Sequence, residues 1–69
     1  MIEFKLKGTL HIDLCDLLKI TGLFSTGAEA KHIIATGVVK VDGVVELRKR
    51  AKILSGQIVE YLHHKIKVL

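Results

Sequence analysis

The pair Asp42-Gly43 constrains the fold of this 69-residue chain more than any other feature. It separates two runs rich in β-branched residues, 38–41 and 44–45. An Asp-Gly pair between such runs predicts a β-hairpin with a two-residue turn, because both residue types tolerate the positive φ that this turn needs. The sequence therefore predicts two antiparallel strands here.

A short helix is predicted at residues 13–20, where three leucines recur at helical spacing. The Thr-Gly-Leu sequence that follows ends it, because Gly22 can adopt the left-handed conformation that commonly closes a helix. Cys15 is the only cysteine of the chain and lies among these leucines. We therefore expect a buried thiol that forms no internal disulfide.

Thr26 and Glu29 mark the start of a second helix. They have the spacing of a capping box, in which a hydroxyl and a carboxylate bond exposed backbone N–H groups. Lys31 and His32 lie off the apolar stripe of this helix and should face solvent. The members of the stripe are Ala30, Ile33 and Ile34. A second Thr-Gly pair, which ends at Gly37, stops this helix in the same way as the first.

Three further segments have the pattern of strands. Residues 2–7 alternate polar and apolar side chains, and residues 58–62 and 65–69 are predicted as strands that follow a Ser-Gly turn. Together these elements indicate an α+β fold of one domain, residues 1–69, in which two helices pack on a small, mostly antiparallel sheet.

The positive charge of the chain is concentrated in one segment. The chain has 11 Lys and Arg residues and 7 Asp and Glu residues, a net charge of +4. Arg48, Lys49, Arg50 and Lys52 hold the whole excess, and no acidic residue lies between positions 46 and 60. Such a run is often only a solvated face. Because it follows a rigid hairpin and lacks interleaved acids, we interpret it as a set of phosphate donors.

The order of helix, loop, helix, tight glycine turn and Asp-Gly hairpin, followed by a basic segment, resembles the RNA-binding domain named for ribosomal small-subunit protein S-four. That domain also occurs in pseudouridine synthases and tyrosyl-tRNA synthetases. Residues 14–19 and 40–50 further resemble the small stand-alone bacterial proteins of the YbcJ type, over nearly the whole length. The residues that carry the wider resemblance are His11, Ile12, Asp13, Asp16, Leu17, Leu18, Gly22, Leu23, Thr26, Glu29, Ala30, Lys31, Ile34 and 37–43.

The resemblance implies an αL RNA-binding motif, in which the two helices and the hairpin contact RNA. Some positions depart from the S-four pattern. His11 stands where an arginine usually opens the first helix, and a Thr-Gly pair at 26–27 replaces the usual Ser-Arg pair. Lys31 keeps the charge of an arginine, and Asp42 replaces the usual asparagine of the turn. On this interpretation, the basic run 48–52 compensates for the missing phosphate contacts.

We therefore predict a non-catalytic protein that binds RNA through phosphate contacts, since arginine and lysine supply fixed cationic donors. With two Phe, one Tyr and no Trp, the chain has too few rings to stack single-stranded bases. The predicted partner is consequently structured RNA, such as ribosomal RNA or a tRNA-like element. The predicted RNA-binding residues are His11, Thr26, Gly27, Lys31, His32, Lys40, Asp42, Gly43, Arg48, Lys49, Arg50 and Lys52.

Other candidate chemistry has less support. His63 and His64 are adjacent, and on a strand they would point to opposite faces, where they could not chelate one metal ion. His11 and Cys15 are four residues apart, but no third group orients them as a base and a nucleophile. The glycines are spaced as helix ends and turns, not as a phosphate-binding loop. We predict no catalytic residue, metal, cofactor or small-molecule substrate.

Two alternatives remain open. A DNA-binding helix-turn-helix also has two short helices, although its turn usually has roughly 3 to 4 residues, whereas residues 21–26 separate the helices here. A protein-interaction adaptor would dock the basic segment on an acidic partner. The chain begins with alternating residues and has no apolar stretch near ~18 residues. We therefore expect a cytoplasmic monomer that makes no membrane contact.

Overall fold

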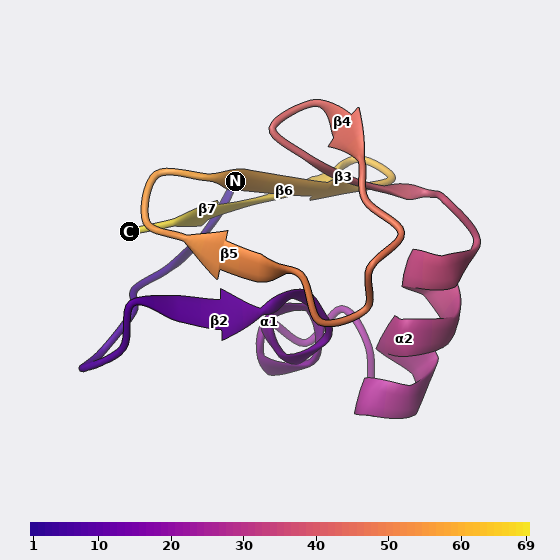
Figure 1. Ribbon diagram of the computed structural model, residues 1–69, viewed down its shortest axis with the longest axis horizontal. Helices are drawn as coiled ribbons and strands as arrows, with labels where there is room; N and C mark the ends of the chain where they lie inside the picture. Colours follow the sequence, from indigo (N-terminus) through magenta and orange to yellow (C-terminus); the bar gives the residue numbers. More distant parts are fainter.

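The computed structural model describes residues 1–69 and contains two helices and seven strands (Figure 1). In chain order they are β1 (Ile2–Phe4), β2 (His11–Asp13), α1 (Leu14–Ile20), α2 (Gly27–Ala35), β3 (Val39–Val41), β4 (Val44–Val45), β5 (Lys52–Leu54), β6 (Ile58–Tyr61) and β7 (His64–Val68). The predicted α+β class is confirmed. Neither helix is long and apolar enough to cross a lipid bilayer.

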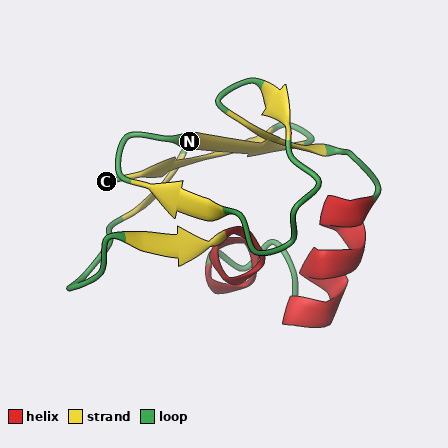
Figure 2. Cartoon of the chain, viewed as in Figure 1, coloured by secondary structure: helices red, strands yellow, loops and turns green.

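Five strands form the larger sheet, in the order β1-β7-β6-β3-β4. β1 runs parallel to β7 and the other neighbours are antiparallel, which confirms the mostly antiparallel prediction. β2 and β5 form a separate antiparallel ribbon. Figure 2 shows both helices and this ribbon on one side of the larger sheet. The other side faces solvent and carries exposed residues such as Lys40, Lys65 and Lys67.

The core lies between the helices and the larger sheet. Leu14, Leu17 and Leu18 of α1 are fully buried, and so is Ile34 of α2. The sheet contributes Val39, Val59, Ile66 and Val68. Each such side chain favours the folded state by about 1.5 to 3 kcal/mol when it leaves water. No polar or charged residue is buried, and the thiol of Cys15 is buried as predicted.

Both helices end as the sequence predicts. Gly22 and Gly37 each have a φ of +84°, the left-handed conformation that closes a helix. The threonine before each glycine reinforces the end, because both its hydroxyl and its backbone N–H donate to a carbonyl of the last turn. Thr21 Oγ1 lies 2.9 Å from the Leu17 oxygen, and Thr36 Oγ1 lies 2.6 Å from the Ile33 oxygen.

The start of α2 shows half of the predicted capping box. The Thr26 hydroxyl oxygen accepts a hydrogen bond from the Glu29 backbone N–H at 3.2 Å, as expected for an N-cap residue. The carboxylate of Glu29 departs from the prediction, because it accepts from the Thr26 hydroxyl at 3.3 Å. The hydroxyl thus donates and accepts, and it fixes the first turn of the helix.

The predicted hairpin is confirmed. Val41 pairs with Val44, and the two turn residues have φ values of 51° for Asp42 and 82° for Gly43. Asp42 also ties the turn to β6. Its carboxylate accepts from the backbone N–H of Ile58 at 2.9 Å and from the side-chain amide of Gln57 at 3.2 Å. The Asp42 side chain is therefore occupied within the fold.

The sequence pattern does not predict the β2–β5 ribbon. Each strand has three residues, too few for an alternating pattern to stand out, and the two strands lie far apart in the chain. The ribbon corrects two expectations. His11 lies in β2 and does not open α1, which starts at Leu14 with Asp13 as its N-cap residue. Lys52 belongs to β5.

Three predicted strands have different ends in the structure. The expected strand 2–7 ends at Phe4, although Leu69 still bonds to the backbone of Phe4 and Leu6 beyond the regular pairing. The expected strand 58–62 ends at Tyr61, and the expected strand 65–69 begins one residue earlier, at His64. A two-residue turn joins them. Leu62 takes a φ of 55° in this turn, which is unusual for a bulky residue. The residue types at this position therefore did not predict a turn.

Replacing Gly37 or Gly43 with valine should destabilise the fold by about 1 to 3 kcal/mol, because a β-branched residue is strained at positive φ. The effect comes from the backbone: a Cβ at Gly37 would lie 3.6 Å from Leu47 Cδ2, an ordinary contact, and a Cβ at Gly43 would meet nothing. Thermal melts of the variants measure this. Gly27→Ala is the matched control, because Gly27 is open and its φ is not positive. Unchanged melting of both valine variants would contradict the assigned turns.

Candidate nucleic-acid interface

The basic segment, residues 48–52, is held by the start of α1. The backbone N–H of Ala51 donates to the Arg48 oxygen at 3.2 Å and closes a turn with Lys49 and Arg50 at its tip. The first N–H groups of a helix have no partner within the helix. Here the N–H of Leu14 donates to the Ala51 oxygen at 2.9 Å, and that of Cys15 donates to the Lys49 oxygen at 3.1 Å.

This arrangement separates the backbone of the segment from its cationic side chains. Its carbonyl groups cap α1, where the N-cap residue Asp13 makes no side-chain capping bond. The charged side chains point outward: those of Arg48 and Arg50 are 79% and 71% exposed. Ala51 is buried beneath them. The fold thus presents solvent-exposed cations on a fixed main chain.

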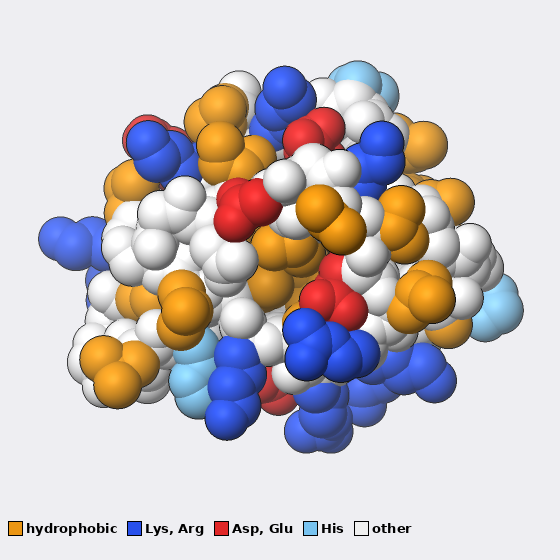
Figure 3. Space-filling model, turned by 45° about the horizontal axis from the view of Figure 1, so that its top comes forward, with side chains coloured by type: hydrophobic (Ala, Val, Ile, Leu, Met, Phe, Trp, Pro, Cys, Tyr) orange, Lys and Arg blue, Asp and Glu red, His pale blue; other side chains and the backbone are white.

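Glu46 offsets part of the positive charge. Its carboxylate accepts from Arg48 Nη2 at 2.9 Å, from Arg48 Nε at 3.1 Å and from the Arg48 backbone N–H at 3.0 Å. The Arg48 hydrogen bonds lower the pKa of Glu46 from 4.5 to about 2. The same pair raises the pKa of the Arg48 guanidinium. In Figure 3, acidic side chains lie among the Lys and Arg side chains.

A second carboxylate reaches the segment from β2. Asp13 Oδ2 lies 3.8 Å from Arg50 Nη1, and Asp13 pairs with Lys52 in the register of the ribbon. The acid-free stretch between positions 46 and 60 therefore does not leave these cations uncompensated, which corrects the interpretation of the sequence. Lys49 is the member that has neither an ion pair nor a carboxylate opposite it.

The ribbon brings one other predicted residue to this place. His11 Nε2 lies 4.0 Å from Asp13 Oδ1, so the β2–β5 ribbon groups His11 with Arg50 and Lys52 around one carboxylate. The available signal in the sequence was complementary charge in two short segments, but three-residue strands give no register by which to align them.

The predicted residues of α2 occupy a different part of the surface. Thr26 caps the start of the helix, and Gly27 is its first residue. His32 is exposed as predicted, but Lys31 is half-buried, which is common where the aliphatic part of a lysine packs on a surface. At the other end of α2, Gly37 approaches the Leu47 side chain, one residue before the basic segment.

The predicted residues of the hairpin do not join the basic segment. Lys40 lies on the solvent side of the larger sheet, opposite Glu60 in the register, because its neighbour Val39 faces the core. Asp42 is bonded to β6, and Gly43 shapes the turn. The turn residues therefore also stabilise the fold, and their contact with RNA stays a prediction.

The interpretation of the sequence did not single out four apolar side chains around β4 that stay exposed. They are Val38, Val44, Val45 and Leu47, each at least 45% exposed. A Cβ at Gly37 would lie within 4 Å of both Val45 and Leu47, so these two side chains gather at the end of α2. The sequence did carry a signal for this exposure. A strand with one buried face usually alternates apolar and polar residues, and the valine pairs at 38–39 and 44–45 do not.

The remaining rings and histidines form no binding platform. Phe24 packs on Tyr61 with ring centroids 5.1 Å apart, and both are partly buried against the core. His63 lies in the turn before β7 and His64 is the first residue of β7, and their rings lie 4.2 Å apart. The chain has no group of three or more His, Cys, Asp or Glu side chains that could hold a metal ion.

Comparison with known proteins identifies the class. The S4 domain family matches residues 4–69, and the chain belongs to this family, which is the S-four domain that the sequence resembles. Within it, the chain is 51% identical over 69 residues to YbcJ of Escherichia coli strain K12, covering 100% of this chain and 99% of YbcJ. YbcJ of Shigella flexneri shows the same identity and coverage.

The fold agrees with a solved relative. The solution structure of E. coli YbcJ matches this structure with a TM-score of 0.78 and 51% identity, over 100% of this chain and 87% of that chain. That structure is described as revealing an αL motif involved in RNA-binding. The predicted resemblance to proteins of the YbcJ type is therefore confirmed.

Replacing Glu46 with glutamine should lower the free energy of unfolding at neutral pH, and this effect should shrink as the pH falls from 4.5 toward 2. A carboxyl group whose pKa falls on folding stabilises the folded state above its unfolded pKa, here 4.5, and loses this contribution as the pH falls toward about 2. The difference in the free energy of unfolding between wild type and variant is small, because the Arg48 side chain is exposed and solvent weakens the ion pair. Urea denaturation of both proteins across this range measures it. A difference that stays constant with pH would contradict the ion pair.

Proposed function

We propose that this chain is a non-catalytic RNA-binding protein that contacts the sugar-phosphate backbone of structured RNA through its basic segment. The observation that carries the proposal is the fixed main chain of residues 48–52, whose carbonyl groups bond to α1 while the cations remain exposed. Membership of the S4 family and the αL motif described for E. coli YbcJ support it.

The cations of the segment have different tasks in this proposal. Lys49 is free to contact a phosphate directly. Arg48 uses Nε and Nη2 on Glu46, which leaves Nη1 for a phosphate oxygen. When RNA binds, Arg50 and Lys52 give up part of their interaction with Asp13 and contact phosphates of the RNA. The compensating carboxylates therefore weaken non-specific attraction and favour an RNA that places phosphates at the right positions.

The partner is structured RNA, such as ribosomal RNA or a tRNA-like element, read mainly by shape. Phosphate contacts carry little sequence information. The pairing of Phe24 with Tyr61 leaves no exposed aromatic platform for successive unstacked bases. His32 and the start of α2 would extend the contact beyond the basic segment, as in the αL motif. The protein acts without a cofactor, as one domain of residues 1–69.

A protein-interaction adaptor is the second candidate function. The exposed side chains of Val45 and Leu47, which gather at the end of α2, favour it, because apolar side chains beside cations are common in protein interfaces. A DNA-binding helix-turn-helix has less support, since residues 21–26 separate the helices and the chain belongs to the S4 family.

The triple variant Arg48→Gln, Lys49→Gln, Arg50→Gln should lose most RNA affinity with melting nearly unchanged. The capping bonds come from backbone carbonyl groups, which the substitutions keep. If three phosphate contacts are lost, the slope of log affinity against log salt should become shallower by roughly 0.7 per contact for single strands or 0.9 for duplex. Titration of one RNA hairpin at several salt concentrations measures both quantities.

The matched control removes three lysines from other exposed positions, as Lys19→Gln, Lys65→Gln, Lys67→Gln. The change of net charge is the same, so any non-specific effect is equal in the two variants. We expect the control to retain most of the affinity. Equal losses in both variants would show that net charge alone drives binding and would remove the basic segment from the site.

Competition between nucleic acids should rank structured RNA first. Wild-type protein bound to a labelled RNA hairpin is challenged with the same hairpin, with duplex DNA and with an unstructured RNA homopolymer. We expect the hairpin to compete best, because the fixed cations match a fixed spacing of phosphates. Best competition by the homopolymer would contradict recognition by shape.

A further inference from the structure

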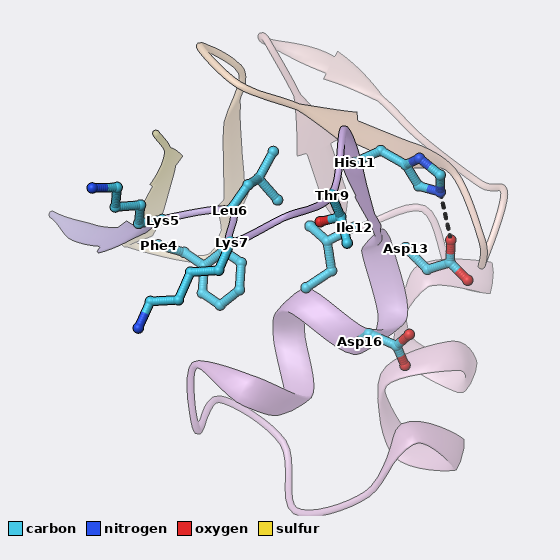
Figure 4. A pocket seen from close by; sticks show the side chains of 9 residues that line it. All are labelled: Phe4, Lys5, Leu6, Lys7, Thr9, His11, Ile12, Asp13 and Asp16. Atoms are coloured by element: carbon cyan, nitrogen blue, oxygen red, sulfur yellow. Dashed lines mark ion pairs between the residues drawn. The ribbon is translucent and has the colours of Figure 1, made fainter.

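A groove opens beside the basic segment, between the chain that leaves β1 and the junction of β2 with α1 (Figure 4). Its volume is about 540 Å³, within the range of sites that bind small ligands. The side chains of Phe4, Leu6 and Ile12 line it with apolar surface. The groove takes no part in the contacts described above, apart from His11 and Asp13 at its edge.

The charged residues of the groove are separated by sign. In Figure 4, Lys5 and Lys7 lie at one end, Asp13 and Asp16 lie at the other, and the apolar side chains lie between them. A ligand that fits must therefore carry negative charge at one end, an apolar ring or chain in the middle, and hydrogen-bond donors at the other end. A nucleotide has these three parts in this order.

The two carboxylates differ in how far the fold occupies them, because Asp13 lies beside Arg50 and His11 whereas Asp16 has no ion pair. Asp13 is the N-cap residue of α1 but makes no side-chain capping bond, because the Ala51 and Lys49 carbonyl groups take the first N–H groups of the helix. Asp16 is exposed and forms no ion pair, and its one contact is a weak hydrogen bond from the Cys15 thiol at 3.9 Å.

The groove is continuous with the basic segment. Asp13 lines the groove and also lies 3.8 Å from Arg50. An RNA strand whose phosphates run from residues 48–52 to Lys5 and Lys7 therefore crosses the groove from its acidic end to its basic end. One unpaired nucleotide of that strand can turn into the groove, which is how proteins commonly read single bases of folded RNA.

We propose that this groove binds one unpaired guanine nucleotide of the RNA, an inference that rests on the proposed function. The base lies on Phe4 and Ile12, the Asp16 carboxylate accepts from N1–H and from the N2 amino group, and Lys5 and Lys7 contact the phosphate. Guanine fits best because its Watson–Crick edge presents two adjacent donors to one carboxylate. Adenine and cytosine place an acceptor nitrogen next to their amino group, and uracil flanks its one N–H with two oxygens.

The test uses four RNA hairpins that differ only in one unpaired loop base. We expect wild-type protein to bind the guanine hairpin roughly tenfold more tightly than the other three, as for one bidentate base contact. The variant Asp16→Asn gives a second readout with a distinctive sign. Removing a negative charge should raise the affinity for every RNA by electrostatics alone, whereas loss of the base contact should lower the affinity for the guanine hairpin selectively.

Glu3→Gln is the matched control, because it removes one exposed carboxylate outside the groove. We expect it to leave the guanine preference intact, and Asp16→Asn to abolish the preference. The inference is overturned if wild-type protein binds the four hairpins equally, or if Asp16→Asn raises all four affinities as Glu3→Gln does. Failure to bind any hairpin would contradict the proposed function itself. The wild-type preference tests the groove even if a variant fails to fold.

Discussion

Two hydrogen bonds organise the surface of this protein, those from the Leu14 and Cys15 N–H groups to the Ala51 and Lys49 oxygens. They satisfy donors that a helix cannot satisfy alone, and they join segments that are far apart in the chain. Since Leu14 and Cys15 are also core residues, the basic segment is tied to the most buried part of the fold. Binding an RNA then costs little backbone entropy, because the loop is ordered in advance.

The same arrangement explains why the charges near this segment are mixed. The β2–β5 ribbon that holds the segment brings Asp13 to Arg50, and the chain leaving β4 brings Glu46 to Arg48. The carboxylates fix the positions of two long side chains, and they lower the attraction for polyanions in general. Under the proposed function, an RNA partner has to replace these interactions with better placed phosphates, so binding would depend on the positions of the phosphates more than on total charge.

Local physical rules account for the parts of the fold that the sequence predicts. The Asp42-Gly43 turn, the Thr-Gly helix ends and the Thr26 cap each depend on residues within four positions of one another. The β2–β5 ribbon depends on pairing between distant three-residue strands, and the turn at Leu62 adopts a conformation that its residue type disfavours. For the site, the cations were predictable from composition. Their partner Asp13 was not, because only the tertiary fold brings it to Arg50.

The most direct test of the central claim is a titration of isotopically labelled protein with an RNA hairpin, followed by amide NMR spectra. The account predicts that the largest changes fall on residues 47–52 and on the amides of Leu14 and Cys15, which bond to that segment. The solvent side of the larger sheet, around Lys65 and Lys67, should change little. Changes centred on that side, with residues 47–52 unaffected, would contradict the account.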